Sequence, residues 1–126
     1  MVVDRQARRV VCVQQGKGSA HDFALYKETL GQRVRGDILV QADSGYQGIE
    51  KLHANSETPK KRSKHHPLTG PEKASNRRLS QERVLVENIN AKIKVFKIMA
   101  YPYRNRRRRH LLRMSLICGI INLETR

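Results

Sequence analysis

The sequence lacks several residue types on which whole classes of protein depend. Tryptophan is absent, and the 126 residues include only two cysteines and two phenylalanines. The two cysteines, Cys12 and Cys118, lie in separate apolar runs without a Cys or His companion, which argues against a disulfide framework or a zinc site. They favour an intracellular, reducing compartment. The longest apolar run, Leu116–Ile121, is too short to cross a bilayer, and no secretory signal is visible.

Acidic residues are also scarce, and the imbalance is concentrated in one part of the chain. There are 11 Asp and Glu against 26 Lys and Arg, a formal net charge of +15. Residues 60–113 hold 17 of the basic residues and only 3 of the acidic ones. Such a segment predicts a polyanionic partner, because cations that neutralise phosphates release counterions. Nucleic acid is favoured over an anionic membrane surface, since no Trp- or Phe-rich amphipathic face accompanies the charge.

The length predicts a single domain with a modest core. Two apolar runs joined by a polar turn indicate a hairpin near the N-terminus, followed by a helix from about Ser19 or Asp22 to Gly31 and a strand over Ile38–Ala42. Within the single domain we expect four parts: strands, a helix and the Asp43 turn over residues 1–55, a basic loop over 56–71, a long helix over 72–99 and a C-terminal helix over 104–122.

Both later helices carry apolar residues that predict burial. On the long helix, Leu85, Ile89, Ile93 and Phe96 form one stripe at helical spacing. The C-terminal helix is rich in leucine and isoleucine, so we expect much of it to be buried rather than to act as a recognition helix. Its apolar residues are Leu111, Leu112, Leu116, Ile117, Ile120 and Ile121.

Two acidic residues lie where chemistry on phosphodiesters would need them. Asp43 directly follows an apolar strand, at a turn that Gly45 permits. Glu87 follows Arg83 by four residues and precedes Lys94 by seven, so the three side chains share one helix face. Taken singly, Asp43 is more simply a turn residue and Glu87 an ion-pair partner of Arg83. Together, the two carboxylates suit magnesium or manganese, which prefer hard oxygen ligands.

Basic side chains flank these carboxylates. Arg83 and Lys94 are candidates for holding phosphate, and Arg is suited to two-point contact. The loop cations Lys60, Lys61, Arg62 and Lys64 are candidates for tracking a DNA backbone. The alternative is that this run and Arg106–Arg109 are merely solvated charges. We interpret His65 and His66 as loop residues and not as metal ligands.

The pattern of Arg83, Glu87 and Lys94, together with the turn Asp43-Ser44-Gly45-Tyr46, resembles the insertion-sequence transposases of the DDE class. The segment His21–Glu28 is similar to the part of those proteins that opens their first helix. The resemblance implies an α/β, RNase H-like mixed sheet with flanking helices. It also implies that Asp43 is the second catalytic aspartate, that Glu87 is the glutamate, and that the reaction is hydrolysis at a transposon end followed by strand transfer into target DNA.

The chain departs from that family in two places. Ser80 stands where the family has a tyrosine, three residues before Arg83. More seriously, the family's first aspartate lies on the first, central strand, and we expect this sequence to begin on the second strand. Asp4 does not replace that aspartate, because it lies in the hairpin turn. We therefore expect a truncated transposase from a decayed or split gene, located in the cytoplasm with the nucleoid.

We expect this chain to be inactive unless a complementing transposase chain supplies the strand, and we expect its partners to be DNA and either further copies of itself or such a complementing chain. A non-catalytic, basic nucleic-acid-binding protein remains the alternative.

Overall fold

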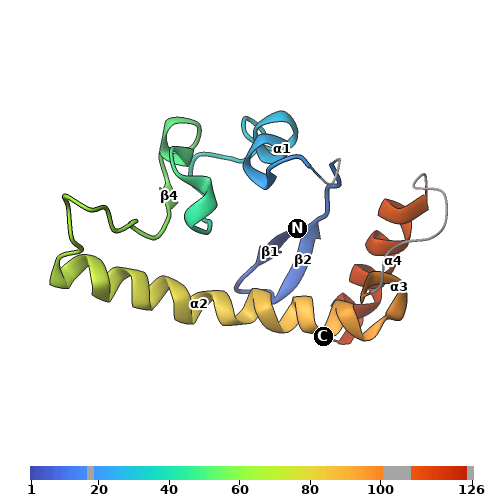
Figure 1. Cartoon of the computed structure of the whole chain (residues 1–126). Helices are drawn as coiled ribbons and strands as arrows, with labels where there is room; N and C mark the ends of the chain where they lie inside the picture. The colour runs from blue at the N-terminus through green and yellow to red at the C-terminus, as the bar shows by residue number, and fades with distance from the viewer. Residues whose placement is uncertain (17–18, 101–108, 125–126) are drawn as a thin grey trace. The chain divides into compact units, whose positions relative to one another are not determined.

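The order of elements is that of a mixed α/β chain, as expected (Figure 1). The structure, a computed structural model, describes residues 1–16, 19–100 and 109–124. Its strands and helices are β1 (Val2–Asp4), β2 (Arg9–Cys12), α1 (Asp22–Thr29), β3 (Val40–Gln41), β4 (Ser56–Glu57), α2 (Gly70–Val95), α3 (Lys97–Ala100) and α4 (His110–Glu124). Two 3-10 turns, η1 (Ser44–Tyr46) and η2 (Ile49–Lys51), separate β3 from β4.

The chain divides into two units, which we describe separately. The first unit comprises residues 1–15 and 83–126, and the second comprises residues 16–82. Helix α2 begins in the second unit and continues into the first. Of the predicted C-terminal segment, the helix start at 104 and most of the arginine run lie outside the described residues.

The predicted N-terminal hairpin is confirmed in the first unit. Strands β1 and β2 are antiparallel, with Val3 opposite Val10 and Asp4 opposite Arg9. Asp4 closes the turn, because its Oδ1 accepts hydrogen bonds from the backbone N–H groups of Gln6 (2.9 Å) and Ala7 (3.0 Å). The hairpin therefore uses the Asp4 carboxylate as a turn cap.

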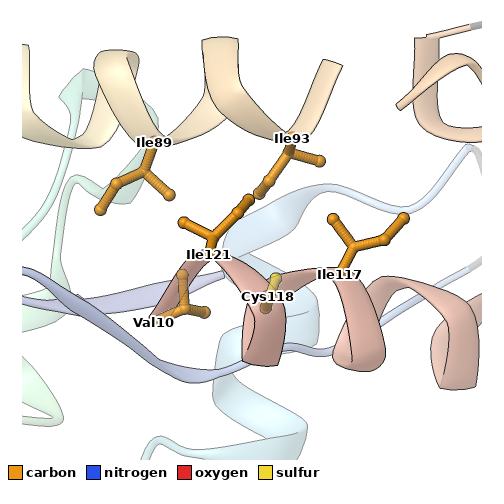
Figure 2. Packing of buried hydrophobic residues seen from close by; sticks show 6 residues of the cluster. All are labelled: Val10, Ile89, Ile93, Ile117, Cys118 and Ile121. Carbon is orange, nitrogen blue, oxygen red and sulfur yellow. The ribbon is translucent and has the colours of Figure 1, made fainter. Parts of the chain in front are cut away.

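The core of the first unit forms where β2, α2 and α4 meet. Figure 2 shows Ile89 and Ile93 of α2 pointing toward α4, with Val10 of β2 in the same cluster. The predicted stripe on α2 is confirmed, since Ile89 and Ile93 are buried and Leu85 and Phe96 pack against the cluster. The buried members are Val10, Ile89, Ile93, Ile117, Cys118 and Ile121.

The expected burial of α4 is only half correct. Ile117 and Ile121 are buried, but Leu112 and Leu116 are 69% and 65% exposed, and Ile120 is also exposed. The reason is geometric: a helix that packs along one side buries one stripe, and residues at 112, 116 and 120 lie on another. Within the described residues, this second apolar stripe remains at the surface.

The long helix begins at Gly70 and ends at Val95, before the expected limit of 99. Thr69 and Glu72 form a reciprocal cap at its start, with Thr69 N–H donating to Glu72 Oε2 (2.9 Å) and Glu72 N–H donating to Thr69 Oγ1 (3.4 Å). At its end, Phe96 N–H donates to the carbonyl three residues earlier, that of Ile93 (3.2 Å). This tighter turn interrupts the helix before α3.

Replacing Ile121 by alanine should lower the free energy of unfolding by about 2–5 kcal/mol, because the side chain is 2% exposed and its loss leaves a cavity between β2, α2 and α4. Urea denaturation measures the change. Leu123→Ala, on the same helix but 59% exposed, should change the free energy of unfolding by less than about 0.5 kcal/mol. Equal losses in the two variants would contradict the described core.

The second unit is built around a short parallel strand pair. Val40 lies opposite Ser56 and Gln41 opposite Glu57, so β3 and β4 run in the same direction. Strand β3 is shorter than the predicted Ile38–Ala42, because the Ile38 carbonyl accepts a hydrogen bond from the buried His53 Nε2 (2.6 Å) instead. The buried apolar side chains of the second unit are Tyr26, Ile49 and Leu79.

None of the helices in the described part of the chain has both the length and the apolar character required to cross a membrane.

Candidate functional site

The Asp43 turn is a short, firmly organised segment that follows β3. Asp43 is exposed, and its Oδ1 accepts a hydrogen bond from the Gly45 N–H (2.8 Å), which caps η1. A Cβ on residue 45 would lie 3.0 Å from that same oxygen, so a side chain at this position would require the Asp43 carboxylate to shift. The bond leaves the carboxylate at the surface in a fixed orientation.

Aromatic packing holds the other side of this turn. The Tyr46 ring lies 5.4 Å from the Phe23 ring and 6.0 Å from the Tyr26 ring, between ring centroids, so η1 is attached to α1. Burial raises the pKa of Tyr46 above its usual value, and the negative charges of Asp22 and Asp43 raise it further. Tyr46 therefore acts as the neutral anchor of the Asp43 turn.

Glu87 lies on the exposed face of α2, with Arg83 one turn before it. The Arg83 Nη2 atom lies 3.8 Å from Glu87 Oε1, and the two side chains are 47% and 65% exposed. A pair this open contributes only a few tenths of a kcal/mol, so either partner can turn to a ligand at little cost. Lys94 is also exposed, two turns further along the same helix.

The predicted site residues fall into both units. Asp43 and the loop cations belong to residues 16–82, whereas Arg83, Glu87 and Lys94 belong to the first unit. Within the first unit, the structure pairs Glu87 with Arg83. Across residues 1–16, 19–100 and 109–124, no group of three or more His, Cys, Asp or Glu side chains is placed to hold a metal ion.

The basic loop leaves β4 and enters α2. Lys60, Lys61, Arg62 and Lys64 are all exposed. The loop makes a turn at its centre, where Ser63 N–H donates to the His66 carbonyl (3.3 Å) and His66 N–H donates to Ser63 Oγ (3.0 Å). His66 is thus part of a loop turn, as predicted. Arg62, Ser63, Lys64 and Pro67 line an open hollow on the surface.

A polar network that the sequence did not reveal joins β3, β4 and α2 within the second unit. Arg78 Nη2 donates to both carboxylate oxygens of Glu57 (3.1 Å each), and Arg78 Nη1 donates to Glu82 (3.3 Å). Gln41 Nε2 donates to Glu57 Oε2 (3.0 Å) and also to Glu82. The i, i+4 spacing of Arg78 and Glu82 was the one readable sign of this network.

The network holds Glu57 in its charged form. The hydrogen bond from Gln41 lowers the pKa of Glu57, and the hydrogen bond and positive charge of Arg78 lower it further, against the opposing effects of burial and of Glu82. A carboxyl whose pKa is lowered in the folded protein stabilises the fold above its unfolded pKa. That stabilisation disappears as the pH falls through the folded pKa.

Replacing Gln41 by leucine should raise the pKa of Glu57, because the largest cause of its lowering is removed. NMR titration of the side-chain carboxyl measures the shift. The variant should be less stable than the parent at neutral pH, and the difference should shrink as both are titrated below the Glu57 pKa. Gln81→Leu, at an exposed position of α2, is the control. An unchanged Glu57 pKa in Gln41→Leu would contradict the network.

Comparisons with known proteins place these features in a family context. A family model described as DDE superfamily endonuclease matches residues 1–122. The chain is similar to the probable transposase for insertion sequence element IS702 of Microchaete diplosiphon, with 44% identity over 124 residues. That match covers 98% of this chain but 45% of the relative, so the chain spans less than half of the relative's length. No solved structure matches the chain.

Proposed function

We propose a function from the premise that the chain belongs to the DDE superfamily endonucleases, whose family model matches residues 1–122. These residues form part of a transposase that hydrolyses a phosphodiester at a transposon end and joins the freed 3′ hydroxyl to target DNA. The family match carries the proposal, and the 44% identity to a probable insertion-sequence transposase supports it. Its partners are then transposon-end and target DNA, and its place is the bacterial nucleoid.

Asp43 and Glu87 are the residues of this chain that we assign to a divalent metal. Both are exposed carboxylates, and such oxygens are the ligand type that magnesium and manganese prefer, so the donor chemistry fits. In a two-metal site held by such carboxylates, one ion would activate the attacking oxygen and the other would stabilise the leaving oxygen. The contribution of the chain is to hold one carboxylate on a capped turn and the other on a long helix.

Arg83, Lys94 and the loop cations would hold phosphates on either side of the reacting bond. Arg83 is suited to this because its pairing with Glu87 is long and exposed, and it can exchange that contact for a phosphate oxygen. The cations of the loop are exposed as well. Together these positive charges would orient the DNA strand and offset the charge that develops at phosphorus.

We further propose that this chain needs a strand and a third carboxylate from residues outside its sequence, in the same or in another polypeptide. Both sheets in the described residues have only two strands, so each of the strands β1 to β4 keeps one edge without a strand partner there. On β2, a side chain bonds the backbone in place of a strand: Asn122 accepts a hydrogen bond from the Val10 N–H (2.8 Å) and donates one to the Val10 C=O (2.9 Å). In an RNase H-like sheet, a central strand would pair with free strand edges of this kind.

The test is a cleavage assay on a transposon end with magnesium. The purified chain alone should not cleave the DNA. A fusion should cleave it, in which the chain is joined to the residues of its transposase relative that lie outside the matched region. Robust cleavage by the chain alone would show that a third carboxylate is already present. DNA binding without cleavage in every combination would favour a non-catalytic nucleic-acid-binding protein.

A further inference from the structure

The start of the basic loop is held by side chains from two directions. Asn76, half-buried on α2, bonds both backbone polar groups of Lys60: its Oδ1 accepts from the Lys60 N–H (2.8 Å) and its Nδ2 donates to the Lys60 carbonyl (2.9 Å). Gln47 Nε2 donates a hydrogen bond to the carbonyl of Pro59, the residue before Lys60 (2.9 Å). All of these residues lie within the second unit.

These hydrogen bonds lie at the exposed surface, where water could bond the backbone N–H and C=O of Lys60 equally well. They are therefore not needed to satisfy buried polar groups. Their effect is to fix the position of the start of the loop. An asparagine amide presents a donor and an acceptor together, as a peptide group does, so bonding both groups of one residue fixes the local backbone. The loop therefore leaves β4 in a defined direction and at a defined point along α2.

Gln47 links that point to the Asp43 turn. It follows η1 directly, four residues after Asp43, and the ring of Tyr46 beside it is packed against α1. The bond from Gln47 to Pro59 consequently connects the segment that carries the candidate metal ligand to the segment that carries the cations. At the other end, the reciprocal cap of Thr69 and Glu72 fixes where the loop joins α2.

We infer that Asn76 and Gln47 are positioning residues for DNA. They hold the loop cations, Lys60 to Lys64, at a fixed place relative to the Asp43 turn, so that the phosphates bound by the loop are in register with that carboxylate. This inference rests on the proposed function, since it requires that the loop contacts DNA. Neither residue is assigned a contact with the reacting atoms.

The experiment combines Asn76→Ala with a loop-neutral background, in which Lys60, Lys61, Arg62 and Lys64 are all alanine. Affinity for a short DNA duplex of arbitrary sequence is measured for the single, loop-neutral and combined variants of the full chain. Asn76→Ala should weaken binding by about threefold to tenfold in the parent and have no effect in the loop-neutral background, because residues that act through one another are not additive. Gln47→Ala should behave in the same way.

Trypsin provides a second measurement that needs no DNA. Each loop cation is a cleavage site, and loosening the anchor should raise the rate of cleavage at Lys60 to Lys64 about threefold to tenfold in Asn76→Ala, since proteolysis follows local opening. Alanine is a better helix former than asparagine, so α2 itself should not be weakened. Asn90→Ala, at an exposed position of the same helix, should change neither measurement.

Three outcomes overturn the inference. Equal weakening of DNA binding by Asn76→Ala in both backgrounds would show that Asn76 acts through the fold and not through the loop. Unchanged cleavage and unchanged binding in both Asn76→Ala and Gln47→Ala would show that the anchor is dispensable. If the loop-neutral variant itself bound DNA as well as the parent, the loop contact of the proposed function would fail, and this inference with it.

Discussion

Asp43→Asn and Glu87→Gln should each abolish metal-dependent cleavage in a complemented, active transposase, lowering the rate by about a thousandfold or more. Each change replaces a charged carboxylate ligand of the divalent ion by a neutral amide, which lowers transition-state stabilisation. Binding to the same transposon end should change by less than about threefold, since neither carboxylate attracts DNA. Single-turnover cleavage and a binding titration, run with the same DNA, separate the two effects.

Both substitutions leave the local structure in place, so loss of cleavage is informative. Asparagine retains a side-chain oxygen to accept the Gly45 N–H, and it caps helical turns about as well as aspartate. Glu87 is 65% exposed and lies 3.8 Å from Arg83, so Glu87→Gln removes a weak ion pair. Thermal unfolding of each variant should match the parent.

Glu124→Gln is the matched control for Glu87. Glu124 is also an exposed glutamate at a helix surface, and its Oε2 lies 3.3 Å from Lys92 Nζ. Losing that pair removes the same charge from the same unit at a position to which no chemistry is assigned. Full cleavage in Asp43→Asn or Glu87→Gln would end the assignment of these carboxylates to a metal, whatever the outcome for DNA binding.

Elements defined by local patterns could be predicted from the sequence. The N-terminal hairpin, helix α1 and the apolar stripe of α2 follow from alternation and helical spacing, which act over a few residues. The predicted cap of α1 by Ser19 or Asp22 was wrong, because His21 stands at the N-cap position and makes no side-chain cap hydrogen bond. The ends of strand β3 and the buried face of helix α4 were less predictable, because both depend on residues far away in the sequence. His53 bonds the carbonyl of Ile38 and shortens the strand, and α4 packs on one side only, leaving Leu112 and Leu116 exposed.

The candidate site shows the same division. The Asp43 turn was readable because aspartate, glycine and tyrosine lie within four residues, and each now has a local role. The anchoring of the loop could not be predicted, since Gln47 and Asn76 bond backbone groups 12 and 16 residues away. Backbone groups are nearly the same in every residue, so the sequence does not show which of them a side chain will bond. Side-chain pairs repeat at helical or strand spacing, but bonds from a side chain to distant backbone do not.

Neutralising the basic loop should have the largest effect on DNA binding. In a variant with Lys60, Lys61, Arg62 and Lys64 all changed to alanine, the slope of log affinity against log salt should fall by up to about 3.6, since each lost phosphate contact contributes about 0.9. Between 50 and 200 mM salt, the parent should therefore lose about a hundredfold more affinity than the variant. A binding titration at several salt concentrations measures the slope.

The decisive comparison is with a variant of equal net charge. Changing Arg8, Arg9, Arg33 and Lys51 to alanine also removes four exposed cations, but all lie outside residues 60–113, where the positive charge is concentrated. If DNA lies against the loop, only the loop variant should lose most of the slope, because counterions are released where phosphates are neutralised. Equal slopes in the two variants would mean that DNA responds to the total charge of the chain, and that the loop has no privileged contact with the phosphate backbone.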